Sequence, residues 1–142
     1  MRTKLATAGL AILLGMGGLA LAPAAAATTT AIATPRAAHA TAPAFNASGT
    51  WQLVQSNSTT ATLNVTQDGS GTLFGTASYS DAVGTIENGS VDGSNISFTI
   101  GWSNGLRGRY VGSLGFDRRL SGTTFDLTHP TSQATWFTPR TF

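Results

Sequence analysis

The sequence has no cysteine among its 142 residues. This absence excludes a disulfide framework, a thiolate metal site and a cysteine nucleophile. Histidine is nearly absent as well, since only His39 and His129 occur. A site built on several imidazole ligands is therefore excluded too. No glycine-rich phosphate loop is present, and we expect no cofactor.

Charge is also scarce. The eight basic residues exceed the six acidic ones by two. Three of the basic residues, Arg2, Lys4 and Arg36, lie in the N-terminal part of the chain. From Thr41 onward the chain has five arginines and six carboxylates, which gives a net charge of −1. A domain with this charge is a poor binder of phosphate backbones, so we expect no nucleic-acid partner.

One hydrophobic run stands at the N-terminus. Arg2 and Lys4 precede the apolar stretch Leu5–Leu21, and small residues follow up to Ala27. This pattern predicts that residues 1–27 are a secretory signal peptide. The run is glycine-rich and at the lower length limit for a span, so we expect no stable membrane anchor. Cleavage after Ala27 and cleavage after Ala40 both fit the small-x-small rule. The predicted location is extracellular or beyond the inner membrane.

Residues 28–44 are rich in alanine, threonine and proline. They have too few bulky apolar side chains to offset the entropy of ordering, so we expect a disordered linker or an extended leader. All twelve aromatic residues lie between Phe45 and Phe142. Residues 45–142 are therefore predicted to form the single folded domain.

This domain has no helical hydrophobic stripe and alternates with a period of two, as in Ile96, Phe98, Ile100 and Trp102. Eight such runs are separated by short turns: 49–55, 60–67, 72–80, 85–92, 95–103, 106–115, 120–128 and 133–142. Asp-Gly and Asn-Gly dipeptides mark hairpins between several of them. We predict an all-β fold, an eight-stranded antiparallel up-and-down β-barrel, with a two-sheet sandwich as the alternative. Asn88-Gly89 is either a turn or a bulge.

Catalytic patterns are sparse. Asp126 and His129 could belong to a hydrolytic relay, but a polar strand end followed by a His-Pro turn is the simpler explanation. We expect a protein that is not an enzyme. A hydrolase using Asp126 and His129 is the catalytic alternative.

Several short segments occur in the order found in one known family. Gly49-Thr50-Trp51, Gly75-Thr76, Phe98-Thr99-Ile100-Gly101-Trp102 and Gly108-Arg109-Tyr110 resemble the avidin/streptavidin family. The resemblance spans Ser48 to Phe142 and implies a small ligand-binding barrel. It also implies that Trp51 closes one end and that Arg140 covers it through a structural cation–π contact.

The resemblance implies a pocket for a small cyclic ligand and leaves a homo-oligomer open. Trp102 matches a ligand-contacting tryptophan of the family, Phe125 falls where another is usual, and Trp136 matches a third. Tyr79 and Asn57 complete the predicted ligand-binding set. Polar partners of biotin are replaced, however, with Leu53 in place of an asparagine and Leu106-Arg107 in place of Trp-Ser. Losing buried hydrogen-bond partners costs several kcal/mol, so we do not expect biotin binding at the family's strength.

An alternative function fits the same fold. Some secreted protease inhibitors also use a small eight-stranded barrel, with an N-terminal segment that enters the protease cleft. The tail before residue 45 is the segment that such a protein-binding module would use.

Overall fold

The computed structural model describes residues 40–142. The signal peptide predicted for residues 1–27, and the predicted linker as far as residue 39, lie outside the described residues. Within residues 40–142 there is no helix long and apolar enough to cross a membrane.

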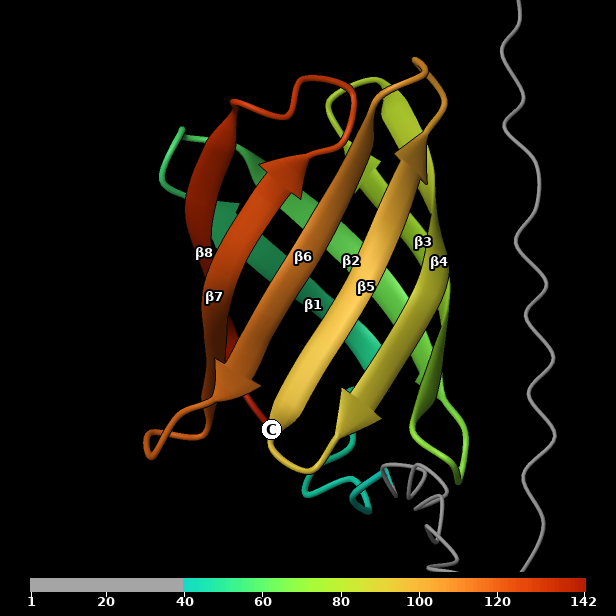
Figure 1. The fold of residues 1–142 in the computed structure, drawn as a ribbon, viewed down its shortest axis with the longest axis vertical. Coiled ribbons are helices and arrows are strands. Elements are labelled where there is room, and N and C mark those ends of the chain that lie inside the picture. Colours follow the sequence, from blue (N-terminus) through green and yellow to red (C-terminus); the bar gives the residue numbers. More distant parts are fainter. Residues whose placement is uncertain (1–39) are drawn as a thin grey trace, which may run out of the picture. The chain divides into compact units, whose positions relative to one another are not determined.

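The described part of the chain is all β and contains no helix. Its eight strands follow one another around the molecule (Figure 1). They are β1 Gly49–Gln55, β2 Thr60–Gln67, β3 Thr72–Tyr79, β4 Ala82–Asp92, β5 Asn95–Trp102, β6 Arg107–Leu114, β7 Arg119–Asp126 and β8 Gln133–Thr141. The predicted runs coincide with these strands apart from a few residues at their ends.

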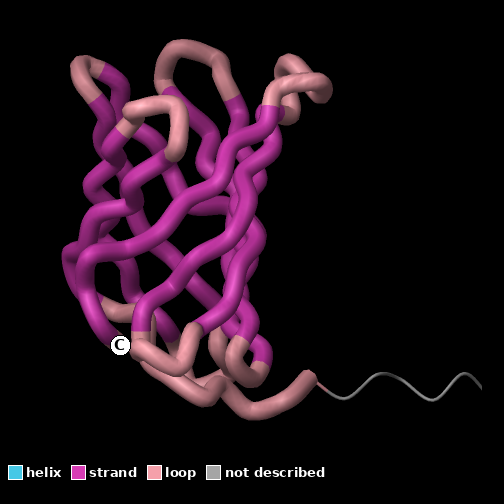
Figure 2. Tube along the Cα trace, turned by 90° about the vertical axis from the view of Figure 1, so that its left-hand side faces the viewer, coloured by secondary structure: helices cyan, strands magenta, loops and turns pink. Residues whose placement is uncertain are grey.

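Every strand pairs antiparallel with the next, and β1 pairs with β8 to close the sheet. The closing contact is short, since it joins Val54 to Phe137 and Gln55 to Trp136. Figure 2 shows the strands crossing obliquely on the two sides of the barrel, with short loops at both ends. The predicted up-and-down barrel is confirmed, and the sandwich alternative is wrong.

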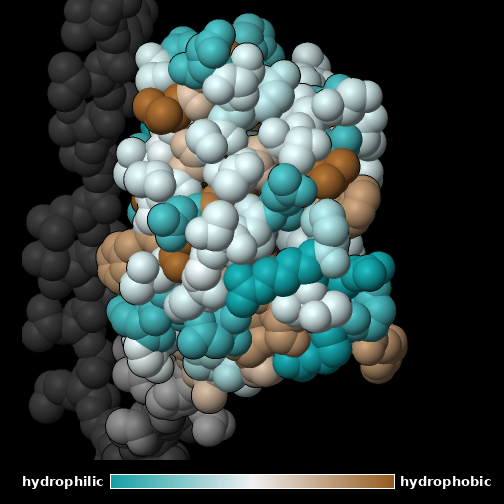
Figure 3. Space-filling model, turned by 180° about the vertical axis from the view of Figure 1, so that it is seen from behind, coloured by the Kyte–Doolittle hydropathy of each residue, from teal (hydrophilic) through white to brown (hydrophobic). Residues whose placement is uncertain are grey.

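The period-two pattern sorts the side chains into an inner and an outer set. Apolar residues from every strand meet inside, and their largest fully buried members include Trp136, Phe98 and Leu53. The outer set is mostly threonine, serine and asparagine, and the face in Figure 3 is white to teal with scattered brown, hydrophobic spots. Closure therefore buries one face of a single sheet without the help of a second layer.

Asn88-Gly89 forms a β-bulge inside β4. Asn88 has a φ of 48°, and the pairing register of β4 shifts between Glu87 and Ser90. Gly89 is buried, and a Cβ there would lie 2.6 Å from the Cβ of Leu73. The bulge bends β4 around the core at this point, which settles the alternative that the sequence left open.

One end of the barrel is closed by aromatic packing. The Trp51 indole Nε1–H donates to the carbonyl of Ala47 at 2.9 Å, and the ring packs edge-on against Phe142 at 5.5 Å. Arg140 lies over the Phe142 ring, 4.8 Å from its centroid, and donates to the carbonyl of Ser48. The cation–π partner of Arg140 is therefore Phe142 and not Trp51, because the C-terminal phenylalanine lies against the indole in the place expected for the arginine.

The folded contacts begin before residue 45. The Thr41 backbone N–H donates to the Asp92 carboxylate, and the Thr41 carbonyl accepts from Gly93. Ala44 donates to the Gly93 carbonyl at 2.9 Å. Residues 41–44, which the composition assigned to the linker, are bound to the β4–β5 turn at the closed end.

Candidate functional site

The opposite end of the barrel holds a cavity of about 190 Å³. Four connections surround it: β1–β2, β3–β4, β5–β6 and β7–β8, which lie together at the upper end in Figure 1. Phe98 and Trp136 are among the largest fully buried side chains of the barrel, and neither lines the cavity. The lining residues are Gln55, Asn57, Thr59, Tyr79, Ala82, Trp102, Asn104, Leu106, Arg107, Gly108, Tyr110, Thr124, Asp126, Ser132, Gln133 and Ala134.

Aromatic rings form one wall. Tyr79 is the last residue of β3 and Trp102 the last of β5, and their rings meet edge-to-face at 6.5 Å. Tyr110 of β6 stacks on Phe98 with the ring centroids 5.0 Å apart and an interplanar angle of 9°. This stack holds the phenol ring rigidly, so that its orientation toward the cavity does not depend on a ligand.

The Tyr110 hydroxyl lies among the polar groups of Thr124, Trp102 and Gln55. Burial raises the pKa of the Tyr110 hydroxyl, while polar groups of Thr124, Trp102 and Gln55 around it act in the opposite direction. The hydroxyl therefore remains protonated at neutral pH. It presents both a donor and an acceptor next to an aromatic surface.

The only carboxylate in the lining belongs to Asp126, the last residue of β7. Its Oδ1 accepts the backbone N–H groups of Thr128 and His129, at 2.8 and 3.0 Å. Its Oδ2 lies 3.1 Å from Nδ1 of His129. Burial raises the pKa of Asp126, but the hydrogen bonds from His129 and Thr128 outweigh this effect and lower it overall. Asp126 is therefore ionised at neutral pH.

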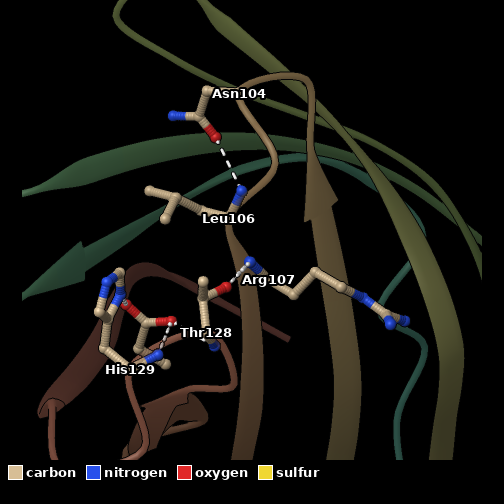
Figure 4. A network of polar contacts seen from close by, with 6 residues as sticks. Asn104, Leu106, Arg107, Thr128 and His129 are labelled. Atoms are coloured by element: carbon tan, nitrogen blue, oxygen red, sulfur yellow. Dashed lines mark hydrogen bonds and ion pairs between the residues drawn. The ribbon is translucent and has the colours of Figure 1, made fainter.

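Two asparagines fix the shape of the rim. Asn57 accepts the Thr59 backbone N–H through its Oδ1 at 3.1 Å, and Asn104 accepts that of Leu106 at 3.2 Å (Figure 4). Such side-chain bonds two residues along the chain hold a turn in one conformation. The β1–β2 and β5–β6 connections are each held by one of their own side chains.

Arg107 lines the cavity, but its guanidinium group lies outside it. Its backbone N–H donates to the Thr128 hydroxyl, while its side chain extends away from Thr128 and His129 (Figure 4). The guanidinium forms an ion pair with Glu87 on the outer surface of β4. The cation in the lining is thus neutralised outside the cavity.

Three of the predicted ligand-binding residues, Tyr79, Trp102 and Asn57, line this cavity. The other two do not. Phe125 is 37% exposed on the outer face of β7, because its neighbours Thr124 and Asp126 take the inward positions. Trp136 points inward but is buried deeper in the barrel and is absent from the lining.

Sequence reasoning missed Asp126, Thr124 and Gln133 as cavity residues. The sequence pattern assigns Asp126 either to a relay or to a polar strand end. The period-two alternation of β7 provides the signal that finds it, since Thr124 and Asp126 share a face with buried Leu120.

The described residues hold one acid–histidine pair and no cluster of metal ligands. Within residues 40–142 no group of three histidine, cysteine or carboxylate side chains is placed to hold a metal ion. The Asp126–His129 pair exists, but no hydrogen bond joins the imidazole to a serine hydroxyl among the described residues. The pair ties the β7–β8 connection to the end of β7.

No family model, no curated protein and no solved structure matches this chain.

Proposed function

We propose that this protein is a secreted, non-enzymatic, avidin-like β-barrel that binds a small ligand in the cavity at its open end. The main support for the proposal is that the side chains of the barrel do not fill its interior at the open end. They leave a concave space with aromatic walls and a few fixed polar groups. Small-ligand sites have this composition, and eight-stranded barrels are wide enough to hold one such ligand.

The size and chemistry of the cavity limit its ligand. Its volume of about 190 Å³ is below the usual range for drug-sized ligands, so the occupant is a small molecule. Leu53 is fully buried in the core where the avidin family presents an asparagine. Trp136 occupies the barrel below the cavity with a bulky apolar ring. We therefore do not propose biotin as the ligand.

Tryptophan fluorescence tests the proposal, because only one of the three tryptophans lines the cavity. Trp51 closes the other end, and Trp136 is 2% exposed. Titration with biotin and with small ring compounds is expected to give a saturable emission change for at least one ring compound. The change should vanish in Trp102→Phe and persist in Trp51→Phe. No change with any compound, or a change that survives in Trp102→Phe, contradicts the proposal.

We also propose that the chain is exported and that cleavage falls between Ala40 and Thr41. Ala38-His39-Ala40 fits the small-x-small rule, and Ala40 is exposed. The backbone N–H of Thr41 donates a hydrogen bond to the Asp92 carboxylate. Cleavage before Thr41 would convert this nitrogen into an α-ammonium group beside the same carboxylate. The neutral hydrogen bond would become a charge-assisted one.

The mass of the intact secreted product tests this cleavage site. Expression of the whole chain in a secreting host should release a product that begins at Thr41. A product that begins at Thr28 contradicts the site, and retention of the entire chain in the cell contradicts export. Ala38→Leu removes the first small residue of the site and is expected to suppress cleavage at residue 40.

A further inference from the structure

We propose, on the basis of the proposed ligand-binding function, that the ligand of the open-end cavity is a small organic cation, such as a protonated amine or a quaternary ammonium compound. Two independent features of the cavity support this class. One is the sign of the charge around its mouth, and the other is the orientation of its aromatic rings.

The mouth carries net negative charge. Among the described residues at this end and beside it, the carboxylates are Asp81, Glu87 and Asp126, and the guanidiniums are those of Arg107 and of Arg109, which lies level with Glu87 across β5. With histidine counted as uncharged, three carboxylates against two guanidiniums leave −1. Glu87 pairs with Arg107 outside the cavity, Arg109 is exposed on the outer face of β6, and no arginine pairs with Asp81 or Asp126 among the described residues. A cleft lined by one sign of charge concentrates ions of the other sign.

The remaining charges are balanced at a distance. The closed end holds Asp68, Asp92 and Asp117 in its turns, close in number to its arginines Arg118, Arg119 and Arg140. Three of the five arginines in residues 40–142 therefore lie at the closed end, and Arg109 is exposed on the outer face of β6. An anionic ligand would find no free guanidinium in the lining, whereas a cation finds the Asp126 carboxylate there.

Asp126 has capacity for another partner. An ionised carboxylate offers about four acceptor positions. Two positions on Oδ1 are taken by the Thr128 and His129 backbone N–H groups, and one on Oδ2 by the His129 ring. A position on Oδ2 is left for a ligand ammonium, and the side chain is 27% exposed.

The aromatic wall favours the same ligand class. The faces of tryptophan and tyrosine rings attract cations, and this attraction is strongest where the cation is partly desolvated. Tyr79 and Trp102 meet at an interplanar angle of 73°, so their faces point in different directions around one corner of the cavity. Tyr79, Trp102 and Asp126 all line this cavity, so a compact cation bound there would lie near two aromatic rings and one carboxylate.

Matched ligand pairs provide the test. We would measure dissociation constants for choline against its neutral isostere 3,3-dimethylbutan-1-ol, and for benzylamine against benzyl alcohol and benzoate. The cations are expected to bind about tenfold more tightly than the neutral partners, which corresponds to 1.4 kcal/mol. Benzoate should bind more weakly than benzyl alcohol.

Two variants locate the preference. Asp126→Asn should reduce the ratio of cation to neutral affinity to near one, whereas Asp117→Asn, the same change in a turn at the closed end, should leave the ratio unchanged. Trp102→Leu gives a second reading should Asp126→Asn fold poorly, and it should weaken choline binding more than binding of the alcohol.

The outcomes separate the two proposals. Equal affinity for cation and isostere, tighter binding of benzoate, or an unchanged ratio in Asp126→Asn overturns the cation inference and leaves the ligand-binding function standing. Failure of every compound in the panel to bind at millimolar concentration overturns both.

Discussion

Replacing Trp136 by alanine probes how the interior of the barrel is filled, and the neighbouring Phe137 supplies a matched comparison. Trp136 is 2% exposed, and its ring centroid lies 6.3 Å from that of Phe98. β6, the next strand but one, accommodates the indole only through a glycine, because a Cβ at Gly112 would lie 2.6 Å from the ring. Phe137 points outward from the same strand and is 50% exposed.

The structure sets the size of the expected loss. Truncating a buried tryptophan costs about 3–5 kcal/mol. The Trp136 Nε1–H has no hydrogen-bond partner within residues 40–142, and removing an unpaired buried donor returns part of that cost. We therefore expect Trp136→Ala to lower the free energy of unfolding by about 3 kcal/mol. For Phe137→Ala, about half the value of a fully buried side chain gives about 1 kcal/mol.

Urea unfolding followed by far-ultraviolet circular dichroism measures both losses, with linear extrapolation to water. The slope of the unfolding free energy against urea should stay the same in both variants, so that the midpoint reports stability alone. Equal losses for the two variants, or a larger one for Phe137→Ala, would refute the inward orientation of Trp136 and with it the pairing register of β8.

Two further predictions concern a backbone contact and the response to acid. A Cβ at Gly122 would lie 1.9 Å from the carbonyl oxygen of Val111, so Gly122→Ala should lower the free energy of unfolding in urea by more than about 3 kcal/mol. A Cβ at Gly69 would have no atom within 4 Å, so Gly69→Ala should lower it by less than about 1 kcal/mol. Because folding lowers the pKa of Asp126 from its ordinary 3.8, this carboxylate stabilises the fold above that pH, and its contribution is lost as the pH falls through the lower folded-state value. In thermal melts, Asp126→Asn should therefore be less stable than the wild type at pH 7, and the two melting temperatures should converge below pH 3.8. A difference in melting temperature that stays constant from pH 7 to pH 2 would rule out this linkage with His129.

Turn chemistry explains why the strands were predictable. Asp92-Gly93 and Asn104-Gly105 lie between the runs, and both glycines have positive φ, at 56° and 85°. The start of β4 was the exception, since the prediction began at Thr85 and the strand begins at Ala82. The turn before β4 contains Ser80 with a φ of 49°. Serine rarely adopts a positive φ, so its presence in the sequence does not predict a turn of this kind.

The site was less predictable for a geometric reason. Alternation tells which side chains face inward, and it places Phe125 outward once Thr124 and Asp126 face inward. It does not tell how deep an inward residue lies, because depth depends on the tilt and stagger of the closed barrel. Trp136 and Trp102 both face inward, yet only Trp102 reaches the cavity. The family resemblance treated the two as equivalent.

The most direct test of the central claim is a ¹⁵N–¹H correlation spectrum of the barrel during titration with choline and benzylamine. Its three tryptophans give one indole N–H resonance each. A ligand in the open-end cavity should shift the Trp102 indole resonance in a saturable way and leave those of Trp51 and Trp136 nearly unmoved. Shifts centred on Trp51, or no shift of the Trp102 resonance at millimolar ligand, would contradict the account.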